Sequence, residues 1–133
     1  MEIDAYAKNV LWLSRHDLTD EQKTSLVNVA NRQACTIGQT MILNIDQLTI
    51  TKIDQTFENA YEIMAFAVKH QAAVIAAVLP TNLLSDLMAI KPDNVCVCIA
   101  KNARKRNPDG EFYFEHESWE IVKKCVYETQ SVY

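Results

Sequence analysis

The feature that most constrains the fold is Ala72–Leu79, a run of eight apolar residues (AAVIAAVL) closed by Pro80. It is far shorter than the roughly 18 apolar residues that span a bilayer. It also lacks the alternation of a strand with one wet face. An unbroken run of this length is typical of a strand covered on both faces, as in parallel sheets flanked by helices. We therefore expect a central strand of an α/β fold here.

Other apolar segments fit the same sheet. The segments Asn9–Ser14, Thr40–Ile45 and Val95–Ala100 predict the first, second and fourth strands. The stretch Gln47–Ile53 alternates loosely, which fits either an extension of the second strand or a separate edge strand.

The chain after the fourth strand predicts a hairpin. Asn107–Gly110 (NPDG) has turn chemistry, and Phe112–Phe114 predicts a strand returning antiparallel to the fourth. The segment Ser118–Glu128 fits a helix or a strand.

Helical spacing predicts three helices between the strands. Their expected bounds are residues 19–34, from about 55 to 70 or 71, and 81–88. Thr19 and Gln22 match the capping box S/T-x-x-E/Q, and Asp54 and Thr81 are the expected caps of the other two helices.

The order of these elements predicts the fold class. Strands that alternate with helices indicate a Rossmann-like, mostly parallel sheet with helices on both faces. The antiparallel hairpin is expected at its C-terminal edge. At 133 residues the chain fits one domain, residues 1–133.

Glycine is scarce, with Gly38 and Gly110 as the only two. This excludes the glycine-rich loops that cradle phosphate, including the P-loop and the dinucleotide motif G-x-G-x-x-G. It also excludes the nucleophile elbow G-x-S-x-G. A phosphate would have to be held by side chains and helix ends.

The charge and the cysteine content limit the partners, the location and the cofactors that we expect. A net charge of −4 argues against a general nucleic-acid coat, so no long nucleic acid is expected, although residues 101–106 (KNARKR) are locally basic. An acidic start without an apolar signal core predicts a cytoplasmic protein that is neither exported nor membrane-bound. Four cysteines without C-x-x-C spacing predict free thiols. Cys96 and Cys98 fit the core better than a metal site, so neither metal nor cofactor is expected.

Polar residues follow three of the predicted strands, where open α/β sheets bind ligands. They are Ser14, Arg15, His16 and Thr19 after the first strand, Thr81 and Asn82 after the third, and Lys101 and Arg104 after the fourth. If these residues share one rim, the rim favours an anionic ligand such as a phosphate or nucleotide. It would combine fixed cations, an imidazole, hydroxyls and helix N-termini.

Structural interpretations of the same residues stay open. Arg15 and His16 fit a pairing with Asp17, the two threonines fit helix caps, and the basic run fits a solvated hairpin.

The segment Val10–Gln22 (VLWLSRHDLTDEQ) resembles the N-terminal motif of small CRISPR-associated ring-nuclease-like proteins, relatives of the CARF (CRISPR-associated Rossmann fold) domains. These open with a strand followed by S-R-H, or by L-T-x-E-Q at the first helix. The segment Val78–Leu87 resembles their third strand, proline and short helix. The likeness covers residues 10–22 well and 72–106 loosely.

The resemblance implies a function in antiviral defence. The implied ligand is a cyclic oligoadenylate second messenger lying across the two-fold axis of a homodimer. The implied reaction is metal-independent: a ribose 2′-hydroxyl attacks the adjacent phosphorus. Arg15 would stabilise phosphate charge and His16 would exchange protons. The implied phosphate contacts are Ser14, Thr19 and the helix start at Thr81, with Lys101 or Arg104 as further cations.

Three alternatives stand beside this hypothesis. One is a non-catalytic sensor or sponge of the same fold. Another is a phosphatase of the histidine type, whose R-H-G-x-T motif is partly matched by Arg15–Thr19, with Asp17 in place of glycine. The third is a structural subunit that contacts another protein through the basic hairpin.

Overall fold

The computed structural model describes residues 2–39, 42–125 and 132. In chain order its elements are β1 (Tyr6–Leu13), α1 (Asp20–Thr36), the 3-10 turn η1 (Ile45–Gln47), β2 (Thr49–Ile53), α2 (Ala60–His70), β3 (Ala72–Ala77), α3 (Thr81–Ile90), β4 (Cys96–Arg106) and β5 (Phe112–Ile121).

The strands form one sheet in the order β2-β1-β3-β4-β5. The first four strands are parallel, and β5 pairs antiparallel with β4. The predicted class is confirmed: a Rossmann-like, mostly parallel sheet with an antiparallel hairpin at its C-terminal edge. Because β2 and β3 lie on opposite sides of β1, the strand order reverses between β1 and β3.

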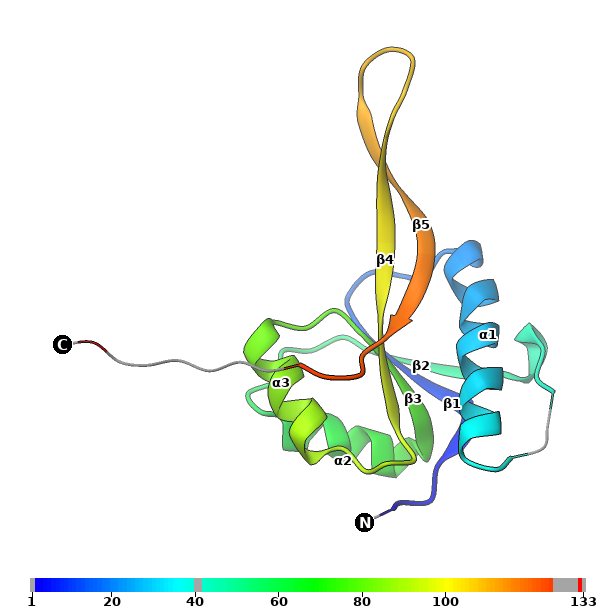
Figure 1. Ribbon diagram of the computed structural model, residues 1–133, viewed down its shortest axis with the longest axis vertical. Coiled ribbons are helices and arrows are strands. Elements are labelled where there is room, and N and C mark those ends of the chain that lie inside the picture. The colour runs from blue at the N-terminus through cyan, green and yellow to red at the C-terminus, as the bar shows by residue number, and fades with distance from the viewer. Residues whose placement is uncertain (1, 40–41, 126–131, 133) are drawn as a thin grey trace.

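Helices cover both faces of the sheet, as predicted (Figure 1). Side chains of a strand alternate between faces, so Val10 and Trp12 of β1 pack in the cluster that includes Leu26 of α1. Leu11 packs on the other side, in the cluster that includes Ile63 of α2 and Leu87 of α3. All six residues of β3 are buried, which confirms the central strand.

The predicted caps were right for α1 and wrong for the other helices. The Thr19 hydroxyl accepts a hydrogen bond from the Gln22 backbone N–H (3.1 Å), and the Gln22 side chain accepts one from Thr19 N–H (2.9 Å). The second helix starts at Ala60 with Asn59 as its cap, so residues 55–58 are loop. In α3 the N-cap is Pro80 and no side chain caps the helix. The preset φ of proline fits a helix start.

The strand predicted over Thr40–Ile45 is wrong where it is described. Residues 42–44 have no regular structure and Ile45 starts η1, while Thr40 and Met41 lie outside the described residues. The backbone of Leu43 is bonded by the Asn31 side chain of α1, which donates to its carbonyl (3.0 Å) and accepts from its N–H (2.7 Å). The Asn31 amide therefore makes the hydrogen bonds that a neighbouring strand would otherwise make. The edge strand of the sheet is β2.

The hairpin is longer than predicted. The fourth strand continues from Cys96 through Arg106, and the fifth extends to Ile121. Residues 122–125 are irregular, and the rest of the ambiguous segment lies outside the described residues. Gly110 has φ +91° in the predicted turn. We call residues 102–116 the arm, because they project from the body of the molecule as a two-stranded ribbon (Figure 1).

The thiols of β4 belong to the core. Cys96 and Cys98 are buried on the face covered by α1, and all four cysteines are free. Burial raises the pKa of Cys96 to about 11 and raises that of Cys98 as well. Both thiols are therefore neutral packing groups at physiological pH.

Candidate functional site

A pocket of about 420 Å³ lies at the carboxyl ends of β1, β2 and β3. It is lined by Leu13, Ser14, Arg15, His16, Asp54, Gln55, Thr56, Phe57, Val78 and Leu79. This location coincides with the reversal of strand order between β1 and β3, where open α/β sheets bind their ligands. The pocket is therefore the candidate functional site.

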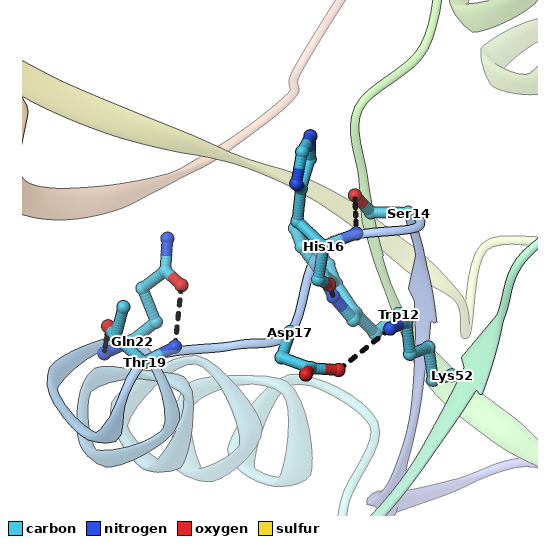
Figure 2. A network of polar contacts seen from close by, with 7 residues as sticks. All are labelled: Trp12, Ser14, His16, Asp17, Thr19, Gln22 and Lys52. Carbon is cyan, nitrogen blue, oxygen red and sulfur yellow. Dashed lines mark hydrogen bonds and ion pairs between the residues drawn. The ribbon is translucent and has the colours of Figure 1, made fainter.

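Hydrogen bonds to its backbone hold the loop after β1 in place. The indole N–H of Trp12 donates to the His16 carbonyl (2.7 Å), and the His16 backbone N–H donates to the Ser14 hydroxyl (3.1 Å). Figure 2 shows the imidazole of His16 pointing away from these contacts. The side chains of Arg15 and His16 are exposed. A buried tryptophan thus fixes the loop and leaves both side chains available to a ligand.

Asp17 does not pair with Arg15 or His16, so that interpretation was wrong. Its carboxylate forms an ion pair with Lys52 of β2 (2.7 Å), which holds the pKa of Asp17 below its usual value (Figure 2). Among the described residues, no ion pair involves Arg15. The guanidinium at the pocket is therefore not neutralised by the neighbouring carboxylate.

The lowered pKa of Asp17 predicts a pH dependence. A depressed carboxyl pKa contributes stability above the unfolded value of 3.8, and this contribution is lost as the pH falls through the folded pKa. Asp17→Asn should therefore be less stable than the wild type at neutral pH, and the difference should begin to shrink near pH 3.8 and vanish below the lowered pKa of the folded protein. Urea unfolding of both proteins across this range measures it. A difference that is independent of pH would exclude the ion pair as its cause.

The contribution of β2 to the pocket was not predicted from the sequence. Asp54, Gln55, Thr56 and Phe57 follow β2 and line the pocket. Because the second strand was predicted over Thr40–Ile45, its carboxyl end was misplaced and Asp54 was interpreted as a helix cap. The loose alternation of Gln47–Ile53 followed by a polar residue is the signal that points to these residues.

Ser14, Arg15 and His16 line the pocket, whereas Thr19, Thr81 and Asn82 do not. The hydroxyl of Thr19 is engaged in the capping box of α1. Thr81 and Asn82 lie exposed in the first turn of α3.

Lys101 and Arg104 also lie outside the pocket lining, because β4 continues past the rim of the sheet. Cys98 is paired with Ala76, the last residue but one of β3, so Arg104 lies five residues beyond the end of β3. At about 3.3 Å per residue this is roughly 17 Å beyond the rim. Lys101 instead lies near Glu120 (3.7 Å) and Glu117 (4.0 Å).

The pocket combines groups of different chemistry. Arg15 supplies a charge-assisted donor suited to a phosphate, and His16 supplies an imidazole whose ring nitrogens can donate or accept a hydrogen bond. Asp54 adds a carboxylate, which repels phosphate and accepts hydrogen bonds from hydroxyl or amine groups. The arrangement suits a ligand that carries both a phosphate and hydrogen-bond donors.

Among the described residues, no group of three or more His, Cys, Asp or Glu side chains has the arrangement of a metal site. Within residues 2–39 and 42–125, no helix has the length and apolar character needed to cross a membrane. Comparison of the chain with protein-family models, with curated proteins and with solved structures gives no match.

Proposed function

We propose that the pocket binds a cyclic oligoadenylate through its phosphates and cleaves it by metal-independent attack of a ribose 2′-hydroxyl. The observation that supports this proposal is the position of Arg15 and His16. Both follow β1 directly and line the pocket at the reversal of strand order. The resemblance of Val10–Gln22 to ring-nuclease-like proteins supplies the identity of the ligand.

The proposed step forms a bond between the ribose O2′ and the adjacent phosphorus and breaks the bond from that phosphorus to O5′. The products are a 2′,3′-cyclic phosphate and a 5′-hydroxyl. The proton leaves the 2′-hydroxyl and another is gained by O5′, and His16 serves this transfer. Arg15 stabilises the charge on the non-bridging oxygens. The hydrogen bonds from Trp12 and to Ser14 support this role by fixing the backbone of His16.

Asp54 favours a nucleotide over free phosphate. It directly follows β2, and in dinucleotide-binding sheets an acidic residue after the second strand binds a ribose hydroxyl. In the proposed complex the phosphate lies at Arg15 and the ribose at Asp54. A pocket of about 420 Å³ holds part of a cyclic oligonucleotide, and the two-fold partner that the resemblance implies would bind the remainder.

Cyclic tetra- and hexa-adenylate are the test ligands. Binding is measured by calorimetry, and cleavage is measured by mass spectrometry in single-turnover reactions. His16→Ala should retain binding and lose roughly 10²–10⁴-fold in cleavage rate, as expected for a lost proton-transfer group. Arg15→Ala should weaken binding by roughly 10- to 100-fold, because a hydrogen bond to a charged group is lost.

Lys69→Ala is the matched control. It removes one positive charge from the last turn of α2, which leads into the amino end of β3 and not its carboxyl end at the pocket, and should change neither readout. Absence of both binding and cleavage at micromolar protein would refute the proposal. Tight binding with intact ligand recovered would establish the sensor or sponge instead. An unchanged rate in His16→Ala would remove His16 from the mechanism.

A further inference from the structure

The two faces of the arm carry different chemistry. In the register of β4 and β5, Arg104 is opposite Phe114 and Arg106 is opposite Phe112. Directly opposed residues of an antiparallel pair share one face. The guanidinium carbon of Arg104 lies 3.9 Å from the centre of the Phe112 ring, and that of Arg106 lies 5.5 Å from it. We call these four residues the Arg–Phe face.

The aromatic rings of this face are open to solvent. Phe112 is 56% exposed and Phe114 is 73% exposed. Large apolar side chains that stand free on a projecting ribbon indicate a binding surface rather than a core.

The opposite face of the arm is neutralised internally. Lys105 forms an ion pair with Glu115 (3.0 Å), which raises the pKa of Lys105. At the base of the ribbon Lys101 lies between Glu117 and Glu120. The carboxylates of Glu115, Glu117 and Glu120 thus lie beside lysines. The charge of the Arg–Phe face comes from its two guanidinium groups.

The base of the arm is anchored on α1. The His116 Nε2 is 2.7 Å from the Ser25 hydroxyl, and the Trp119 indole N–H donates to the Gln22 carbonyl (3.0 Å). The Trp119 ring also packs edge-on against Trp12 at 5.8 Å. These contacts hold the ribbon in an extended position and present its Arg–Phe face to a partner.

We infer that the Arg–Phe face binds single-stranded nucleic acid. Arg104 and Arg106 are two residues apart on one strand, so they lie about 6.7 Å from each other and can each contact a phosphate of an extended backbone. The exposed ring of Phe114 offers a stacking surface, and only unpaired bases expose the faces that stack on it. Because the net charge of the chain is −4, we expect this attraction to be limited to the arm.

Fluorescence anisotropy with a labelled oligouridylate and oligothymidylate of roughly twelve nucleotides tests the inference. Two phosphate contacts predict that log K falls with log salt concentration with a slope of about −1.4. The double variant Arg104→Ala/Arg106→Ala should bring this slope close to zero and abolish most binding. Phe114→Ala should weaken binding at least fivefold with the slope unchanged, because a stacked base is lost and no charge is removed.

Lys105→Ala/Glu115→Ala on the opposite face is the control and should leave the affinity within about twofold, because it removes an ion pair and keeps the net charge of the arm unchanged. Circular dichroism confirms that each variant is folded. Failure of both oligonucleotides to bind would overturn the inference, as would equal affinity in all variants. Preference for a duplex of the same sequence would also overturn it. Light scattering that shows the double variant losing self-association would assign this face to a second copy of the chain instead.

Discussion

Replacing Trp12 by alanine is expected to lower the free energy of unfolding by about 3–5 kcal/mol. The side chain is 4% exposed, and its ring joins β1 to Trp119 at the base of the arm. The same side chain donates the hydrogen bond that holds the His16 carbonyl. Its loss therefore leaves a cavity under α1 and releases the loop of the candidate site. Urea unfolding followed by far-UV circular dichroism measures the change.

Trp12→Phe is the control that separates these two effects. It keeps most of the apolar volume and loses the donor, so the stability should fall by about 1 kcal/mol more than the smaller ring alone explains. In the proposed enzyme this variant should bind ligand and cleave it more slowly, because the backbone of His16 is no longer fixed. A Trp12→Ala protein within 1 kcal/mol of the wild type would contradict the role of this side chain in the core.

Ile75→Ala is expected to cost about 2–5 kcal/mol. Ile75 is fully buried at the centre of β3 and packs in the cluster formed with α2 and α3. Its neighbours along the strand, Val74 and Ala76, face the opposite layer and cannot fill the space that it vacates. Chemical denaturation of the variant and the wild type gives the difference.

Two milder variants serve as comparisons for this prediction. Ile75→Val removes one methylene group and should cost about 0.5–1.5 kcal/mol. Ile50→Ala, in the half-buried edge strand β2, should cost less than Ile75→Ala because its site is already open to solvent. If the edge variant were as damaging as the central one, β3 would not be the centre of the core.

The parts of the fold that were predictable depend on local signals. Ala72–Ala77 is apolar throughout, and such a run is typical of a strand covered on both faces. The start of α1 was also predictable, because a capping box is formed by two residues three positions apart. Both features can be identified without knowing what lies opposite in the sheet.

The second strand was not predictable in this way. Whether the segment around Leu43 forms a strand depends on its contact with a residue outside the segment. The apolar segment around Leu43 has the residue types of a strand. The Asn31 side chain of α1, however, forms hydrogen bonds with both the N–H and the carbonyl of Leu43. This error moved the end of the strand and concealed Asp54. Four of the ten residues that line the candidate pocket, residues 54–57, were therefore not predicted, whereas Ser14, Arg15 and His16 were found from the loop after β1.

The hairpin was predicted, but the length of its arm was not, for a related reason. Residues 101–106 have the composition of a loop, and they are extended because β5 supplies the pairing. Hydrogen bonds from a neighbouring strand are independent of side-chain type, so polar segments can join a sheet without an apolar pattern. This is why the predicted cations at the rim proved to belong to a ribbon beyond it.

The two outer strands of the sheet affect the tendency of the protein to aggregate. An open strand edge is a template for pairing with another chain and so for aggregation, unless it is short, charged or bulged. On one side β2 has only five residues and carries Lys52. On the other side β5 carries Glu115, Glu117 and Glu120, and its pairing shifts register beside Lys101 and Asn102. Brevity, charge and a bulge are thus the features of this sheet that disfavour pairing of its two outer strands with another chain.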